Sequence, residues 1–180
     1  MNVPNREEPT AKYKECFKKG VLYQDFVMSM LIKHRGYAVT NFSSRWFQVN
    51  VGESLQGVET KLCSHTESLF IETHKKFHPE NKDWTPSGIN RKNNTKIYVV
   101  GNYFLFYLFD VKVLRKRVKE SRYLGEFDKN IGKGIFTSDT GKGVYMPISE
   151  IEEDDCYIDK IECREDGELF SENLKNSRTA

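Results

Sequence analysis

The sequence predicts an α/β (α+β) domain in which helices flank a central mixed β-sheet. Near the N-terminus, apolar residues recur at the three- to five-residue spacing of an amphipathic helix. Most of the following chain consists of short alternating or continuous apolar segments, which are typical of strands. With 180 residues, the chain is long enough to bury one core, and we expect a single domain over residues 1–180.

The first predicted helix covers residues 11–34. Its apolar stripe comprises Phe17, Val21, Leu22, Phe26, Met30 and Leu31. Gly20 lies within this run and could divide it in two. We expect the helix to end at Gly36, because basic residues followed by glycine are typical of a helix C-terminus. The polar residues 1–10 are expected to be flexible.

Extended segments are predicted between this helix and a long polar loop. Their bounds are 37–42, 45–51, 55–62 and 68–76. Residues 45–51 alternate apolar and polar side chains, as a half-buried strand does. The segment 78–94 contains two prolines, a glycine and four asparagines, which indicates a functional or mobile loop.

The rest of the chain is expected to complete the sheet and to add one basic helix. Residues 96–110 predict two strands around a turn at Gly101-Asn102, and residues 111–122 predict an amphipathic helix. The other expected elements are a glycine-rich loop over 129–143, a strand over 144–148, a helix beginning at 149 and a strand over 157–163. We expect the core to span about residues 11–153 and residues from about 165 to 180 to form a flexible acidic tail.

Charge is distributed unevenly along the chain. Residues 73–122 contain 12 lysines and arginines against 4 acidic residues, whereas residues 150–180 contain 4 against 11. A basic middle with interleaved aromatic residues favours a polyanionic partner such as DNA, although a solvated surface is the alternative. The acidic tail could be a solubilising end, or it could mimic nucleic acid and cover the basic face.

The sequence also favours an intracellular, cytoplasmic protein. No apolar run approaches 18 residues, so we expect no membrane segment, and the polar N-terminus lacks the apolar region of a secretory signal. The four cysteines include no C-x-x-C pair and are interpreted as free thiols in a reducing compartment.

Two acids occupy unusual positions in predicted strands. Glu72 follows Leu69, Phe70 and Ile71, and Glu59 lies in the preceding predicted strand. A buried carboxylate is costly unless it is paired, protonated or bound to metal. If the two strands are neighbours, these carboxylates could share one Mg²⁺ or Mn²⁺, with the carbonyl of Thr73 completing the coordination.

Basic residues beside Glu72 could complete a hydrolytic site. In an extended strand Glu72, His74 and Lys76 share one face, and a bulge would favour Lys75 instead. A lysine there could orient an attacking water or stabilise charge on phosphate, and His74 could act on the water. Glu53 is a further candidate acid, or merely a turn residue.

These features resemble the PD-(D/E)XK nuclease superfamily. The resemblance covers roughly residues 12–153 and implies a restriction-endonuclease-like core. In that core a helix carries an acidic residue or glutamine, one strand carries an acid, and the next strand carries the D/E-x-K motif. Glu59 would supply the first acid, Glu72 the second, and Asp25 or Gln24 the helix residue. The segments most similar to small phage and bacterial nuclease-like proteins of unassigned role are Gln56 to Lys76, Pro86-Ser87-Gly88-Ile89 and Tyr98-Val99-Val100. The departure is His74, which occupies the place of the expected lysine.

Other residues could contact DNA or a metal. The candidates for nucleic-acid contact are Trp84 and Ser87 in the long loop and Arg115, Lys116, Arg117, Lys119 and Arg122 on the basic helix. The alternatives are a loop packed on its own tryptophan and a solvated helix face. A zinc site from Cys63, His65, His74 and His78 would have a spacing that fits no common motif.

The sequence therefore predicts a Mg²⁺- or Mn²⁺-dependent DNA endonuclease or exonuclease. The alternative is a catalytically inactive nucleic-acid- or protein-binding module of the same fold, its lysine lost to His74. A third reading is a protein-binding factor that acts through its acidic tail. The aromatic strand pair at 103–109 could form a homodimer interface or belong to the core.

Overall fold

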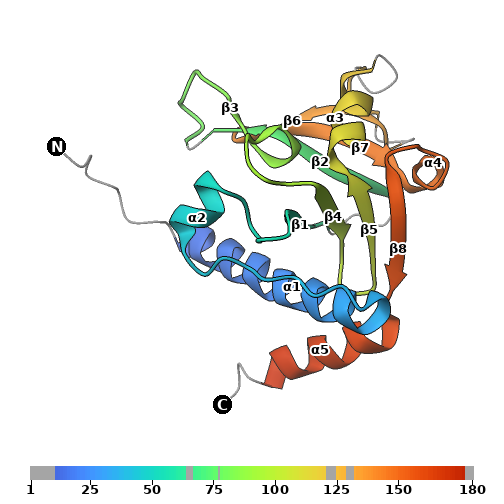
Figure 1. Ribbon diagram of the computed structural model, residues 1–180. Coiled ribbons are helices and arrows are strands. Elements are labelled where there is room, and N and C mark those ends of the chain that lie inside the picture. Colours follow the sequence, from blue (N-terminus) through green and yellow to red (C-terminus); the bar gives the residue numbers. More distant parts are fainter. Residues whose placement is uncertain (1–10, 64–66, 77, 121–124, 129–131, 177–180) are drawn as a thin grey trace.

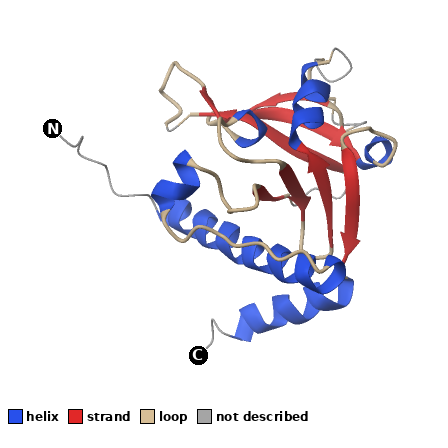
Figure 2. Ribbon diagram, viewed as in Figure 1, coloured by secondary structure: helices blue, strands red, loops and turns tan. Residues whose placement is uncertain are grey.

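The computed structural model describes residues 11–63, 67–76, 78–120, 125–128 and 132–176. The polar residues 1–10, which were expected to be flexible, lie outside the described residues. Helices, a mixed sheet and an antiparallel sheet make up the chain, so the predicted α+β class is confirmed (Figures 1 and 2). Instead of the single central sheet that was predicted, the described residues form two sheets of four strands each.

The first sheet is mixed and has the strand order β1-β4-β5-β8. Its members are β1 (Val58–Leu62), β4 (Ile97–Gly101), β5 (Leu105–Asp110) and β8 (Tyr157–Glu162). Strand β1 pairs parallel to β4, and the other pairs are antiparallel. Strand β1 therefore lies at one edge of this sheet.

The second sheet is antiparallel and has the order β3-β2-β7-β6. Its members are β2 (Ser68–Lys75), β3 (Thr85–Pro86), β6 (Gly134–Thr137) and β7 (Gly141–Pro147). Strands β1 and β2, which carry Glu59 and Glu72, thus belong to different sheets. The expectation that they are neighbouring strands is wrong, because β1 pairs with β4 and β2 pairs with β3 and β7.

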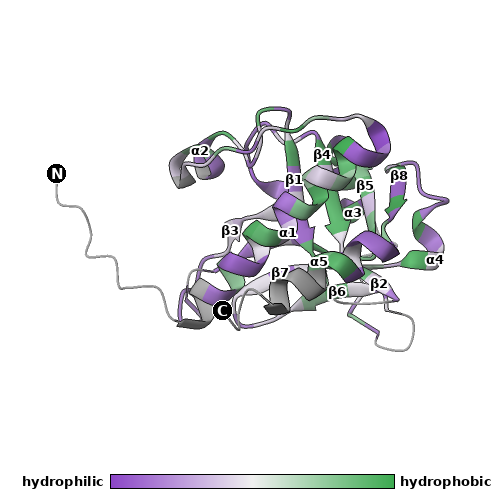
Figure 3. Ribbon diagram, turned by 90° about the horizontal axis from the view of Figure 1, so that it is seen from below, coloured by the Kyte–Doolittle hydropathy of each residue, from purple (hydrophilic) through white to green (hydrophobic). Residues whose placement is uncertain are grey.

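Alternation along the strands divides the core into two clusters. On β4, Val99 packs on the side of the first sheet that faces helix α1 (Ala11–Arg35), whereas Tyr98 and Val100 pack between the two sheets. The inter-sheet cluster also receives Val111, Leu114 and Val118 from α3 (Val111–Lys119), as the predicted apolar face requires. Figure 3 shows hydrophobic residues along β4 and alternating hydrophobic and hydrophilic residues around α1.

Helix α1 (Ala11–Arg35) covers the first sheet without interruption at Gly20. It buries Tyr23, Phe26 and Leu31, and it ends at Gly36, whose φ of 62° is readily adopted only by glycine. None of the described helices has a long enough apolar stretch to cross a membrane. The strand pair predicted as core or dimer interface is mostly core, since Phe106, Tyr107 and Phe109 are buried.

Several expectations about local structure are wrong. Residues 45–51 form a short helix, α2 (Arg45–Asn50), and residues 37–42 contribute only one bridge, from Asn41 to Ser54. Short apolar runs are ambiguous between helix and strand, and the φ of 144° at Gly52 favours a stop after this helix. The final segment, expected to lack regular structure, contains α5 (Arg164–Asn176).

The glycine-rich stretch 129–143 is a sheet hairpin over most of its described residues rather than a loop. A Cβ on Gly143 would lie 2.3 Å from the carbonyl oxygen of Ile71 and 2.6 Å from the ring of Phe70. Glycine therefore permits the close approach of β7 to β2. Two short elements complete the described fold, η1 (Gly88–Asn90) and α4 (Ile148–Ile151).

Candidate active site

Glu59 is the central carboxylate of the candidate site. It is 0% exposed, and its place on β1 beside Tyr98 of β4 directs it into the space between the sheets. Its Oε2 accepts a 3.1 Å hydrogen bond from Thr95 Oγ1. Its Oε1 has no hydrogen-bond partner among the described residues but forms a 3.2 Å ion pair with Lys61 Nζ.

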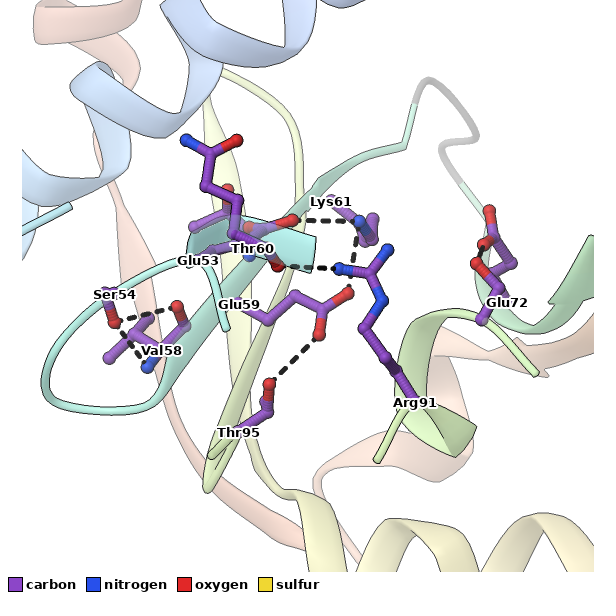
Figure 4. Close-up of polar contacts among 11 residues, drawn as sticks. Glu53, Ser54, Val58, Glu59, Thr60, Lys61, Glu72, Arg91 and Thr95 are labelled. Atoms are coloured by element: carbon purple, nitrogen blue, oxygen red, sulfur yellow. Dashed lines mark hydrogen bonds and ion pairs between the residues drawn. The ribbon is translucent and has the colours of Figure 1, made fainter. Parts of the chain in front are cut away.

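Lys61 lies between two carboxylates. Its Nζ is 3.2 Å from Glu53 Oε1 and also 3.2 Å from Glu59 Oε1 (Figure 4). Burial alone would lower the pKa of Lys61, but the charges of Glu53 and Glu59 oppose this and raise it well above its ordinary value. Lys61 is therefore a protonated ammonium at neutral pH.

A tight turn brings Glu53 back to β1. Ser54 Oγ accepts a 2.7 Å hydrogen bond from Val58 N, and Glu53 Oε2 accepts a 2.9 Å bond from Thr60 N. Gly57 has a φ of 77°, and a Cβ there would lie 2.4 Å from the carbonyl oxygen of Asn94. The turn thus depends on a glycine at this position, and it fixes the Glu53 carboxylate against the strand that carries Glu59 and Lys61.

Tyr98 places a buried hydroxyl near the same charges. The residue is 0% exposed, and its hydroxyl has no hydrogen-bond partner among the described residues. Burial raises the pKa of Tyr98, while Lys61 lowers it and Glu59, Glu72 and Glu53 raise it. A buried hydroxyl without a partner is costly, so this group could be satisfied by a bound water or ligand.

Glu72 approaches the site from the second sheet. Its Oε1 accepts a short hydrogen bond from Ser87 Oγ, and Ser87 is 1% exposed. The Thr73 carbonyl, predicted to bind metal, accepts a 2.9 Å hydrogen bond from Ser87 N. In the view of Figure 4, Glu72 and Glu59 lie on opposite sides of Arg91. Ser87, which was predicted to contact nucleic acid, is thus a buried support for Glu72.

The basic residues that follow Glu72 in the sequence contact other parts of the protein. Lys76 Nζ lies 4.7 Å from the centre of the Trp84 ring, so the predicted catalytic lysine packs on the predicted stacking residue. A register shift lies between Glu72 and His74, and Lys75 pairs with Thr85 in the β2–β3 ladder. Burial and the charge of Lys142 lower the pKa of His74, whose Nδ1 lies 3.1 Å from Thr73 Oγ1.

The first helix turns Asp25 away from the carboxylates. Asp25 is exposed on α1, whereas its neighbour Gln24 is 7% exposed and has a buried Nε2 without a partner among the described residues. Of the two helix candidates, Gln24 is therefore the buried one.

The basic helix α3 uses its arginines for internal contacts. Arg115 donates to the carbonyl oxygens of Ile89 and Arg91, and Arg117 pairs with Asp154, Asp155 and Glu120. Lys116 and Lys119 are exposed. Arg122, also predicted to contact nucleic acid, lies outside the described residues.

Within the described part of the chain, no three His, Cys, Asp or Glu side chains gather closely enough to hold a metal. The zinc alternative is not supported there, and His65 lies outside it. Glu53 and Glu59 still offer the hard oxygen atoms that Mg²⁺ binds, and Mg²⁺ commonly needs only one or two protein carboxylates. The two carboxylates already face one cation, the Lys61 ammonium, at 3.2 Å from an oxygen of each.

Comparison with known proteins finds no matching family model, no similar curated protein and no similar solved structure. The function must therefore be inferred from the site itself.

Lys61 is the site residue that sequence reasoning missed. Glu59-Thr60-Lys61 has the D/E-x-K spacing in the sequence. From the sequence, Glu59 fits the first acid of the motif, which places the expected lysine near Glu72. The ion pairs of Lys61 place a lysine at that spacing beside two carboxylates, although Glu53 lies in the turn before β1 and not on a separate strand.

Proposed function

We propose that this protein is a metal-dependent phosphodiesterase that hydrolyses DNA, with Glu53, Glu59 and Lys61 at its active centre. The observation that carries the proposal is the position of Lys61 Nζ, 3.2 Å from each carboxylate, on a D/E-x-K spacing. We further propose that α1 with the first sheet forms a restriction-endonuclease-like core. The D/E-x-K spacing of Glu59 and Lys61 on β1 supports this assignment, whereas Glu72, the second acid of the sequence resemblance, lies on the second sheet.

The residues present fit a role for Mg²⁺ or Mn²⁺. Glu53 and Glu59 would hold the ion, and when bound it would supply a Lewis acid for the phosphate and lower the pKa of a bound water. Lys61, kept protonated by the two carboxylates, would stabilise negative charge on the reacting phosphate. Thr95 and the Thr60 amide orient Glu59 and Glu53 by hydrogen bonds.

The test is cleavage of supercoiled, linear and single-stranded DNA in Mg²⁺, Mn²⁺ or EDTA. We expect cleavage that requires metal and falls about 100-fold or more in Glu59→Gln, because the loss of one of the two carboxylates that would hold the metal removes the electrostatic stabilisation that the ion supplies. Glu80→Gln is the matched control, since Glu80 is an exposed acid. Metal-dependent cleavage that survives in Glu59→Gln would refute the assignment.

The second candidate is a non-enzymatic nucleic-acid-binding module of the same fold. It is favoured by the ion pairs of Lys61 with Glu53 and Glu59, because these three side chains would then form a structural cluster instead of an active site. This alternative predicts metal-independent binding without cleavage, weakening steeply with salt. We also propose that the protein forms a homodimer, because many nucleases use two copies of the chain to cut the two strands of DNA.

A further inference from the structure

A basic cavity lies next to the carboxylate site. It has a volume of about 370 Å³ and is formed where β2, β3, the loop around η1 and α3 meet. Its wall carries Arg91, Lys92, Asn93, Arg115 and Lys119, together with His74. Among the described residues, no acidic side chain lines it, so four basic side chains face a shared space without a carboxylate among them.

The wall of this cavity is rigidly built. Arg115 donates to the carbonyl oxygens of Ile89 and Arg91, which ties α3 to the end of η1. Asn93 accepts a 3.1 Å hydrogen bond from Thr95 N through Oδ1. Its Nδ2 is buried and has no partner among the described residues. A buried amide donor without a partner is costly, and an acceptor bound beside it would satisfy this group.

The cavity is linked directly to the candidate active site. Thr95 connects the two, since its amide donates to Asn93 and its hydroxyl donates to Glu59. Arg91 makes a second link, because its Nη1 lies 3.4 Å from the Gln48 carbonyl oxygen, in the helix that leads to Glu53. Figure 4 shows the Arg91 side chain extending from its loop toward Glu59 and Lys61.

We propose that this cavity binds a phosphate group of a nucleic-acid strand, adjacent to the phosphodiester bound at Glu59 and Lys61. This inference rests on the proposed function, in which the neighbouring site at Glu59 and Lys61 binds the phosphodiester to be cleaved. Lysine, arginine and amide donors are the groups that bind phosphate oxygens. Lys92 and Lys119 are the exposed cations of the wall, and neither has an ion-pair partner among the described residues. In this proposal, Lys92 and Lys119 contact the phosphate.

The experiment measures binding of a fluorescent 20-base-pair duplex by anisotropy in EDTA, where metal-dependent cleavage cannot occur. The doubly substituted Lys92→Gln/Lys119→Gln protein is compared with Lys112→Gln/Lys116→Gln. The control pair removes the same charge from exposed lysines of α3 that do not line the cavity, so it also tests the sequence-based prediction that Lys116 contacts DNA. We expect the first pair to weaken binding about tenfold or more and to lower the slope of log K against log salt by about one to two.

The control pair is expected to weaken binding only about threefold or less. Equal losses in the two pairs would show a diffuse basic surface and overturn the proposal, as would no loss in either. Duplexes with and without a 5′-phosphate distinguish the source of the phosphate. A gain from the terminal phosphate that disappears in Lys92→Gln/Lys119→Gln assigns a strand end, and equal affinity assigns an internal phosphate.

This binding assay, read together with the cleavage assay of the proposed function, separates the two proposals. Wild-type protein that binds DNA through Lys92 and Lys119 but never cleaves it would leave the phosphate site standing and refute the nuclease. Cleavage that requires Glu59 while both lysine pairs behave alike would do the reverse.

Discussion

At the scale of single residues, the surroundings of each lysine decide which one can act on phosphate. Lys76 lies over Trp84, whereas Lys61 lies between Glu53 and Glu59. We expect Lys61→Met to reduce metal-dependent cleavage about 100-fold or more, because a charge at the reacting phosphate is lost. Lys76→Met should retain activity within about threefold, since it removes a charge outside the carboxylate cluster. Steady-state cleavage rates at saturating metal measure both effects.

Two controls make this prediction specific. Lys61→Met leaves two carboxylates without their cation, so its folding must be checked by thermal unfolding, and Lys61→Arg should recover part of the stability. The raised pKa of Lys61 means that its ion pairs are complete below the ordinary lysine pKa of about 10.4 and are lost only above the raised value. If the cleavage rate fell more in Lys76→Met than in Lys61→Met, the active site would instead lie near Glu72.

At the scale of elements, the sequence predicts the helices and strands whose apolar residues follow a local pattern. Helices α1 and α3 repeat apolar residues at helical spacing, and β4 and β5 are continuous apolar runs around a turn, so their location follows from local pattern. The pairing of β1 with β4 is different, because parallel strands meet only through distant connections. This pairing separates Glu59 from Glu72, and no local pattern could have revealed it. Lys61, by contrast, was open to prediction from its two-residue spacing after Glu59.

Arg115 is expected to act mainly as a support for the loop around η1. Its hydrogen bonds to Ile89 and Arg91 are charge-assisted, so we expect Arg115→Ala to lower the free energy of unfolding by about 1.5–3 kcal/mol. The neighbouring Lys116→Ala is the control and should change it by less than about 0.5 kcal/mol, since Lys116 is exposed. Urea unfolding of both variants measures the difference. An unchanged stability in Arg115→Ala would mean that the arginine is available to a ligand instead.

At the scale of the whole molecule, the acidic segments are divided between two places. Asp154 and Asp155 pair with Arg117 and neutralise part of α3. Helix α5 instead lies beside α1, at the end of the molecule away from α3 (Figure 1). There Asp166 forms a 2.7 Å ion pair with Lys33, and Phe170 packs against Phe26 and Tyr103. The placement of α5 favours a structural role over a cover for the basic face.

Phe170→Ala distinguishes these roles. The ring is partly buried between Phe26 and Tyr103, so we expect the free energy of unfolding to fall by about 1–3 kcal/mol, less than for a fully buried phenylalanine. DNA affinity should stay within about twofold of wild type, because α5 does not reach the basic cavity. Leu169→Ala is the control on the same helix, since Leu169 is 61% exposed. Denaturant unfolding and anisotropy measure the two quantities. If Phe170→Ala instead tightened DNA binding severalfold with little loss of stability, the tail would be an inhibitory cover that competes with nucleic acid.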